Sequence, residues 1–94
     1  MKLAWTRVAV EDLGHAYEYI SAENPSAAAS VIKRIETAAK ALEAFSQIGR
    51  PGRVEGTREL VVSETPFILP YRVFKNRVEI LAVIHAARRW PEGF

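Results

Sequence analysis

The chain has 94 residues, of which 49% are hydrophobic and 26% are charged, with a formal net charge of +2 and no cysteine. This length predicts one domain over residues 1–94 with a thin core, because so short a chain buries only about 60–65% of its unfolded surface. The lack of cysteine excludes disulfides and thiolate metal sites, and it fits a cytoplasmic protein. No apolar run approaches the roughly 20 residues that cross a membrane, and the first residues predict no signal peptide.

The charge is distributed unevenly along the chain. Residues 1–45 carry five Lys/Arg and six Asp/Glu, a balance of −1, whereas residues 46–94 carry eight and five, a balance of +3. Seven of those eight cations are arginines, which suit bidentate contacts with phosphate or carboxylate groups. The C-terminal half therefore carries either a partner-binding surface or an ordinary solvated basic face.

Two helices are expected near the N-terminus. Residues 2–5 read as an edge strand, and Thr6 can cap the helix that follows. The apolar stripe expected for this first helix is Val10, Leu13, Ala16/Tyr17 and Ile20. We expect Trp5, Tyr17 and Tyr19 to pack in the core or at its rim, and His15 to lie at the surface or rim without a chemical role.

The second helix has the clearest pattern. Asn24 followed by Pro25 is a helix start signal, with asparagine as the cap and proline at the first helical position. The apolar stripe continues over five turns: Ala28, Val31, Ile32, Ile35, Ala39, Leu42 and Phe45. Only a few residues join the two helices, so they should form an antiparallel hairpin.

The remainder of the chain predicts a small sheet. Residues 46–56 form a loop rich in glycine, and strands are expected over 57–62, 67–74 and 78–84, the last buried on both faces as a central strand. Pro70 should lie at a bulge or with its nitrogen facing away from a partner, and Lys75-Asn76 is a plausible hairpin turn. The expected fold is α+β, with an N-terminal helical hairpin packed on an antiparallel sheet of three to four strands.

Most familiar chemical sites are missing from the sequence. The two histidines, His15 and His85, do not have metal-ligand spacing, so we expect no metal and no cofactor. One cluster remains at the end of the last strand: His85, Arg88, Arg89 and Trp90. Histidine suits acid–base work, arginines hold phosphates and tryptophan stacks on bases, which together suit RNA cleavage. The alternative is an ordinary polar end to a strand.

Two further arginines lie within the expected strands. Alternation places Arg58 with Leu60 and Val62 on one face of its strand, and Arg72 opposite Tyr71 in the next. We expect Arg58 and Arg72 to share the sheet surface away from the helices. That surface either meets a partner or carries solvated arginines paired with Glu59, Glu64 or Glu79.

The ordered set of segments resembles the RelE/ParE superfamily of toxins from type II toxin–antitoxin modules. The resemblance covers about residues 2–91 and includes AVEDLGHAYEYI, Asn24-Pro25, GRPGRVEGTREL, PFILPYRV and VEILAVIHAARRWP. It implies a bacterial, cytoplasmic toxin that arrests growth and is neutralised by a cognate antitoxin. The antitoxin would dock beside the helical hairpin or at the sheet edge, and operator DNA would be bound only through the antitoxin.

Two activities are known in this superfamily, and the sequence is closer to the ParE-like branch. That branch inhibits DNA gyrase without being an enzyme, and GTREL, PYRV and IHAARRWP resemble its members. The RelE-like branch cuts mRNA on the ribosome as a metal-independent endonuclease. There His85 and Arg88 would be catalytic, but Ser63 and Trp90 stand where that branch commonly has a basic residue and a tyrosine. Arg58, Arg72, Arg89 and Trp90 are the expected target- or phosphate-binding residues.

Overall fold

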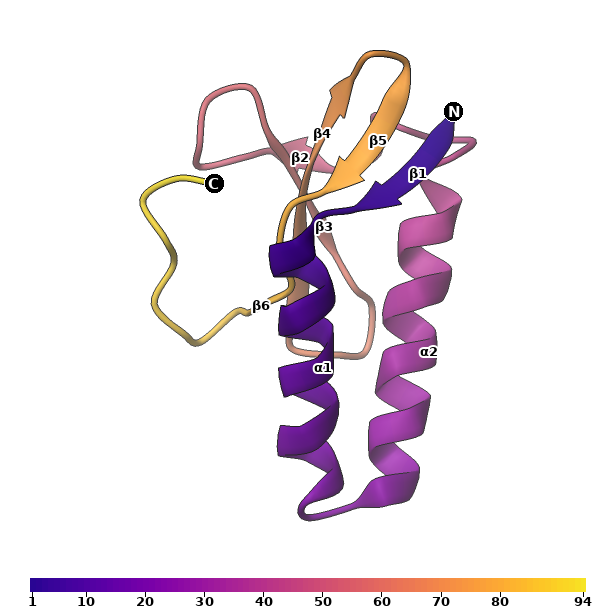
Figure 1. The fold of residues 1–94 in the computed structure, drawn as a ribbon, viewed down its shortest axis with the longest axis vertical. Coiled ribbons are helices and arrows are strands. Elements are labelled where there is room, and N and C mark those ends of the chain that lie inside the picture. Colours follow the sequence, from indigo (N-terminus) through magenta and orange to yellow (C-terminus); the bar gives the residue numbers. More distant parts are fainter.

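The computed structural model describes residues 1–94 and has two helices on one side of a six-stranded sheet (Figure 1). The elements follow in chain order: β1 (Lys2–Trp5), α1 (Arg7–Ser21), α2 (Pro25–Ala41), β2 (Arg50–Pro51), β3 (Arg58–Val61), β4 (Phe67–Phe74), β5 (Arg77–Ile80) and β6 (Ile84–His85). The α+β class and the helical hairpin are therefore confirmed. No helix is both long enough and apolar enough to span a membrane.

Both helix starts match their sequence signals. The Thr6 hydroxyl accepts a hydrogen bond from the Ala9 N–H at 3.1 Å, and the Asn24 side chain accepts one from the Ala27 N–H at 3.1 Å. Each bond satisfies an N–H that has no partner within the helix. The helices then run side by side as an antiparallel hairpin whose closed end projects beyond the sheet (Figure 1).

The sheet is larger than expected and is mixed. Its strand order is β1-β5-β4-β3-β2, and β6 pairs with β4. The pair between β1 and β5 is parallel, which is possible because no short hairpin joins these two strands. The remaining pairs are antiparallel. The β4–β5 hairpin turns at Lys75 and Asn76, as predicted, and both residues have positive φ.

The expected strand over 78–84 is wrong in one respect. Residues 78–84 are all buried, but residues 81–83 form no strand and separate β5 from β6. Pro70 explains the break: its C=O accepts a bond from the Leu81 N–H at 2.8 Å, and the N and C=O of a strand residue point to the same side. The proline nitrogen, which cannot donate, thus faces the gap between the two strands.

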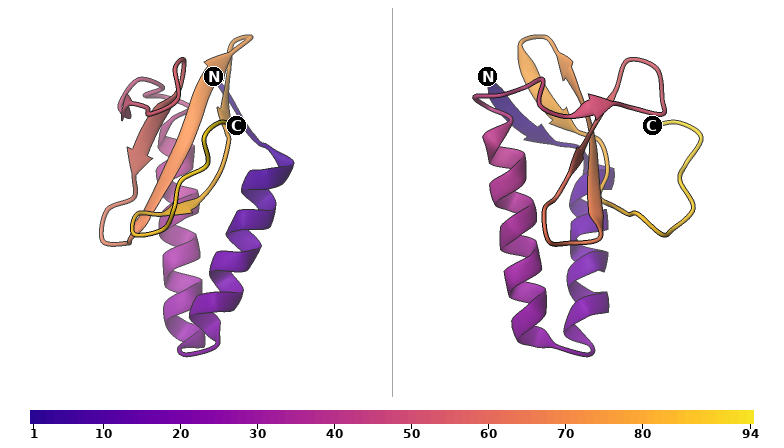
Figure 2. Two further views of the ribbon diagram at one scale, coloured as in Figure 1. Left: turned by 90° about the vertical axis from the view of Figure 1, so that its left-hand side faces the viewer. Right: turned by 180° about the vertical axis from the view of Figure 1, so that it is seen from behind.

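The core lies between the helical hairpin and one face of the sheet. In Figure 2 the strands pass in front of the helices when the molecule is seen from behind. The buried cluster contains small residues of α1, the stripe of α2 and alternate residues of β4 and β5: Ala9, Ala16, Ile35, Ala39, Leu42, Val62, Phe67, Leu69, Tyr71, Val78, Ile80 and Val83.

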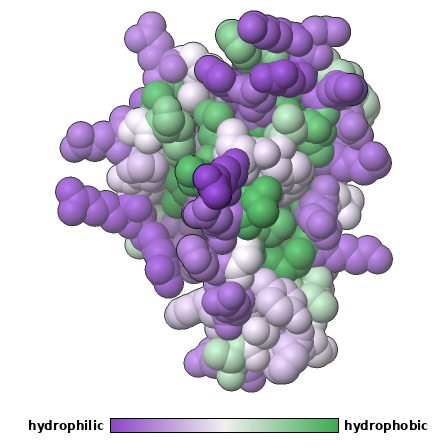
Figure 3. All heavy atoms as spheres, viewed as in Figure 1, coloured by the Kyte–Doolittle hydropathy of each residue, from purple (hydrophilic) through white to green (hydrophobic).

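Several predicted core positions are instead exposed. In α1 the side toward the core has Ala9 and Ala16 buried and Leu13 and Ile20 partly buried, whereas Val10 and Tyr17 face solvent. Small alanines let α1 approach the rest of the core closely, and this leaves the bulkier residues on either side outside. Phe45, beyond the end of α2, is exposed as well, as is Tyr19. Figure 3 shows apolar groups exposed among hydrophilic ones in the middle of the face seen in Figure 1.

Candidate functional site

Two carboxylates organise the arginines on the face of the sheet that points away from the helices, which we term the open face. Cross-strand partners lie on the same side of a sheet, and the register pairs Glu59 with Pro70 and Arg72 with Glu79. Tyr71, between Pro70 and Arg72, points into the core. The two glutamates and Arg72 therefore share the open face.

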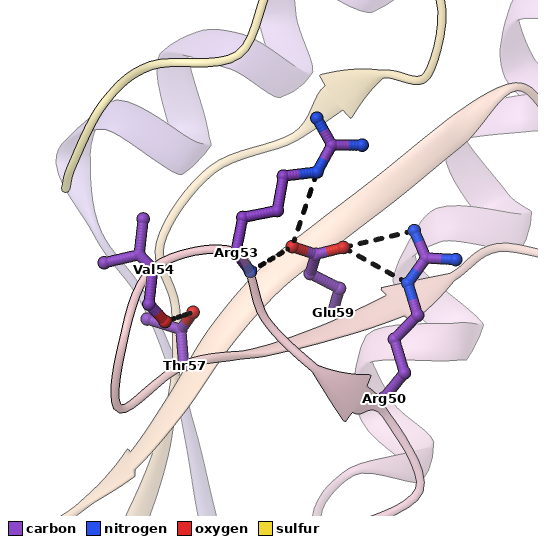
Figure 4. A network of polar contacts seen from close by, with 5 residues as sticks. All are labelled: Arg50, Arg53, Val54, Thr57 and Glu59. Carbon is purple, nitrogen blue, oxygen red and sulfur yellow. Dashed lines mark hydrogen bonds and ion pairs between the residues drawn. The ribbon is translucent and has the colours of Figure 1, made fainter.

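Glu59 forms the first of these clusters (Figure 4). Its carboxylate is 3% exposed and lies between two guanidinium groups, with Arg50 at 3.1 Å and Arg53 at 4.0 Å. The Arg53 backbone N–H also donates to it at 2.8 Å. A buried carboxylate needs such partners, and here they fix the loop between β2 and β3.

Glu79 forms the second cluster with Arg72 and Arg77. Both arginine contacts with the carboxylate are 2.7 Å long. The hydrogen bond from Arg72, and then that from Arg77, hold the pKa of the Glu79 carboxyl below its ordinary value of 4.5. Arg72 also lies over the Phe74 ring, 4.5 Å from its centroid. Four arginines on the open face are thus paired with two glutamates.

The C-terminal segment carries the remaining predicted site residues. His85 meets the edge of the Phe67 ring with 5.5 Å between ring centroids, and its Nδ1 accepts a bond from the Ala87 N–H at 3.1 Å. Arg88 lies over the Tyr19 ring, 5.3 Å from its centroid. His85, Arg88 and Arg89 line one pocket, so the structure brings these three together.

Trp90 and Arg58 lie elsewhere. Trp90 stacks under the Arg53 guanidinium at 3.8 Å, and its indole N–H is buried without a hydrogen-bond partner. The expectation that Arg58 and Arg72 share a face is wrong, because Arg58 pairs across the sheet with Tyr71 and so lies on the helix side. Its guanidinium donates to the carbonyls of Gln47 and Gly49 at 3.3 and 2.8 Å.

The sequence reasoning missed the contribution of α1 to the pocket. Asp12, His15 and Tyr19 line it together with Val8, all from one side of the helix. Their spacing in the sequence could have indicated this, because residues 8, 12, 15 and 19 are three or four apart and so lie on one side of a helix. His15 lies at the surface as expected, whereas the Asp12 carboxylate accepts a bond from the Val83 N–H at 3.0 Å.

Comparison with known proteins finds a family and named relatives. Residues 3–90 match the family described as "ParE toxin of type II toxin-antitoxin system, parDE". The chain is 45% identical over 91 residues to Y4kP of Sinorhizobium fredii, named as a candidate toxin, covering 97% of this chain and 94% of that one. It is 36% identical over 87 residues to toxin RelE2 of Caulobacter vibrioides, covering 93% and 97%.

A solved structure matches the fold. A chain from the chromosomal ParDE TA system of P. aeruginosa superimposes with a TM-score of 0.82 at 34% sequence identity, covering 90% of this chain and 95% of that one. The match extends over both the helical hairpin and the sheet, because 90% coverage leaves out only a small part of the chain.

Proposed function

Because the chain belongs to the ParE toxin family of type II toxin–antitoxin systems, we propose that it arrests bacterial growth by inhibiting DNA gyrase. The observation that carries the proposal is the match over residues 3–90 to a family defined by parDE toxins. A cognate antitoxin is implied by this membership. Gyrase acts on chromosomal DNA, so the toxin would work in the cytoplasm. We further propose, from the family membership, that it meets operator DNA only through its antitoxin.

The hydrogen bonding of His85 does not favour it as a general base. His85 Nδ1 is engaged by the Ala87 N–H, and the Asp12 carboxylate is engaged by the Val83 N–H. Since Nδ1 accepts this bond, the neutral imidazole carries its proton on Nε2, and its one acceptor nitrogen is already occupied. A general base needs an open acceptor within reach of the proton that it removes, so this arrangement does not favour His85 as a base.

The proposed target surface combines the C-terminal segment with the adjoining open face. Arg89 and Trp90 lie on the first, and Arg72 on the second. Stacking of Arg53 on Trp90 at 3.8 Å joins the C-terminal segment to the loop that Glu59 fixes beside the open face. Arg58 is not part of this surface, because its guanidinium is bonded to two backbone carbonyls of the chain itself.

A second candidate is a ribosome-dependent mRNA endonuclease of the RelE-like kind. It is favoured by the grouping of His85, Arg88 and Arg89 around one pocket, and by the 36% identity to a protein named RelE2. In that case His85 would act as acid or base while the arginines hold phosphate.

One assay pair separates the two candidates. The purified chain is added to gyrase in supercoiling and DNA-cleavage assays, with the antitoxin-bound chain as control, and to ribosomes translating a defined mRNA. Lost supercoiling or accumulated cleaved DNA, relieved by antitoxin, is the expected result. Unaffected gyrase together with mRNA cut on the ribosome would overturn the proposal in favour of the second candidate.

A further inference from the structure

A pocket of about 660 Å³ opens between α1 and the C-terminal segment. Its floor consists of apolar residues from β4, from the break between β5 and β6, and from β6: Phe67, Leu81, Ala82, Val83 and Ile84. Val8 and Tyr19 form the wall on α1, and both are more than half exposed, at 55% and 65%. Such a cavity favours an apolar side chain, because filling it removes apolar surface from water.

The rim of the pocket holds the arginines that remain available to a partner. Arg88 and Arg89 line it, and neither forms an ion pair within the chain. The arginines of the open face are instead each bonded to a buried glutamate: Arg50, Arg53, Arg72 and Arg77. A free guanidinium binds a carboxylate through two parallel hydrogen bonds. Among the arginines, the capacity to bind a further anion is therefore concentrated at this pocket.

Asp12 is the one side-chain carboxylate that lines the pocket, and its single negative charge offsets only part of the charge of the two arginines. Asp12 accepts a hydrogen bond from the Val83 N–H at the strand break, which directs one of its oxygens into the protein. The other titratable groups facing the pocket are His15, His85 and the Tyr19 hydroxyl. The pocket thus combines an apolar floor with a net positive rim.

We propose that this pocket receives a segment of the cognate antitoxin in which an apolar side chain is flanked by Asp or Glu. The apolar side chain fills the space between Val8 and the strand break, and the carboxylates pair with Arg88 and Arg89. A nucleic acid has phosphates for the rim but no aliphatic group for the floor. The proposal rests on membership of the toxin family and does not depend on gyrase as the target.

Two valines on α1 provide a matched test by photo-cross-linking. Val8 and Val10 are 55% and 56% exposed, but only Val8 lines the pocket. A benzophenone amino acid is placed at either position in the purified toxin–antitoxin complex, and cross-linked peptides are identified by mass spectrometry. We expect position 8 to capture an antitoxin peptide with an apolar residue beside Asp or Glu, at several times the yield of position 10. Equal yields, or capture of a peptide without acidic residues, would overturn the proposal.

Charge reversal tests the rim independently. Arg88→Glu with Arg89→Glu should weaken antitoxin binding by about 10- to 100-fold and reduce its dependence on salt. Lys33→Glu with Lys75→Glu reverses two exposed charges outside the pocket and should change affinity by less than about threefold. Unchanged affinity of the arginine variant would refute the proposal. Gyrase assays run separately, so failure here and failure of the proposed target are distinguishable.

Discussion

The hydroxyl of Tyr71 links the central strand to the loop after α2. It accepts a hydrogen bond from the Gly49 N–H at 2.9 Å and donates one to the Ser46 carbonyl at 2.8 Å. Gly49 is required beside it, because a Cβ at this position would lie 2.6 Å from the tyrosine ring. The loop that leads to β2 and to the open face is thus held in place by one buried side chain.

Replacing Tyr71 by Phe should therefore destabilise the fold. The change removes one oxygen and leaves the Gly49 N–H and the Ser46 carbonyl without their partner, which costs about 1–3 kcal/mol. Urea unfolding followed by circular dichroism measures the loss. Tyr17→Phe is the control, because Tyr17 is exposed and its hydroxyl forms no hydrogen bond within the chain. Equal stability of the two variants would contradict the role given to the hydroxyl.

Replacing Glu59 by Gln should loosen the loop between β2 and β3. The neutral amide cannot pair with Arg50 and Arg53, and both guanidiniums then lie beside a group without charge. We expect a loss of about 1–3 kcal/mol in the free energy of unfolding and faster amide exchange over residues 50–57. Glu55→Gln, in the same loop but exposed, should change neither. Unaltered exchange in the Glu59 variant would show that the ion pairs do not hold the loop.

Stability should fall in acid because of Glu79. Its pKa is lowered in the folded protein by Arg72 and then Arg77, so the folded state binds fewer protons than the unfolded state near pH 4. The contribution to stability is complete above the ordinary value of 4.5 and is lost as the pH falls through the lower, folded value. Urea unfolding from neutral pH down to about pH 3 should show Glu79→Gln less stable than the unmodified protein at neutral pH, with the gap closing in acid. A constant gap would contradict this linkage.

His85→Gln separates the two candidate functions. A glutamine oxygen can still accept the bond from the Ala87 N–H, so the local turn should persist. If the chain inhibits gyrase, we expect the variant still to arrest growth and still to abolish supercoiling. A nuclease that used His85 would instead lose about 10²- to 10⁴-fold in cleavage rate. Circular dichroism confirms folding, and loss of arrest in a folded variant would count against the gyrase proposal.

The helices were predicted well where the local signals were strong. Asn24 and Pro25 fix the start of α2, and the spacing of Ile35, Ala39 and Leu42 fixes its buried side. The α1 sequence has bulky apolar residues on both sides of an alanine stripe, so periodicity alone does not show which side is buried. Packing decides it, because only the alanine side lets the helices and sheet approach closely.

The candidate site was harder to predict because it depends on register. Alternation within one strand is local, but whether Arg58 shares a face with Arg72 depends on which residues pair across β3 and β4, and a shift of one residue reverses the answer. The pocket likewise needs α1 beside the C-terminal segment, a contact between residues far apart in the chain. The sequence identified His85, Arg88 and Arg89, whereas Asp12 and Tyr19 required the fold.

The parallel pairing of β1 with β5 has a consequence for the order in which the fold is completed. Lys2 pairs with Arg77, and Trp5 with Ile80. The edge strand β1 therefore cannot join the sheet until β5, more than 70 residues later in the chain, is present. Contacts between such distant residues form slowly, because a long loop must close before they stabilise anything. During synthesis the helical hairpin can form first, but β1 can take its place in the sheet only after residues 77–80 have been made. A partly made chain therefore has its two helices before it has either a complete sheet or the pocket, whose floor and rim come from Phe67 and residues 81–89.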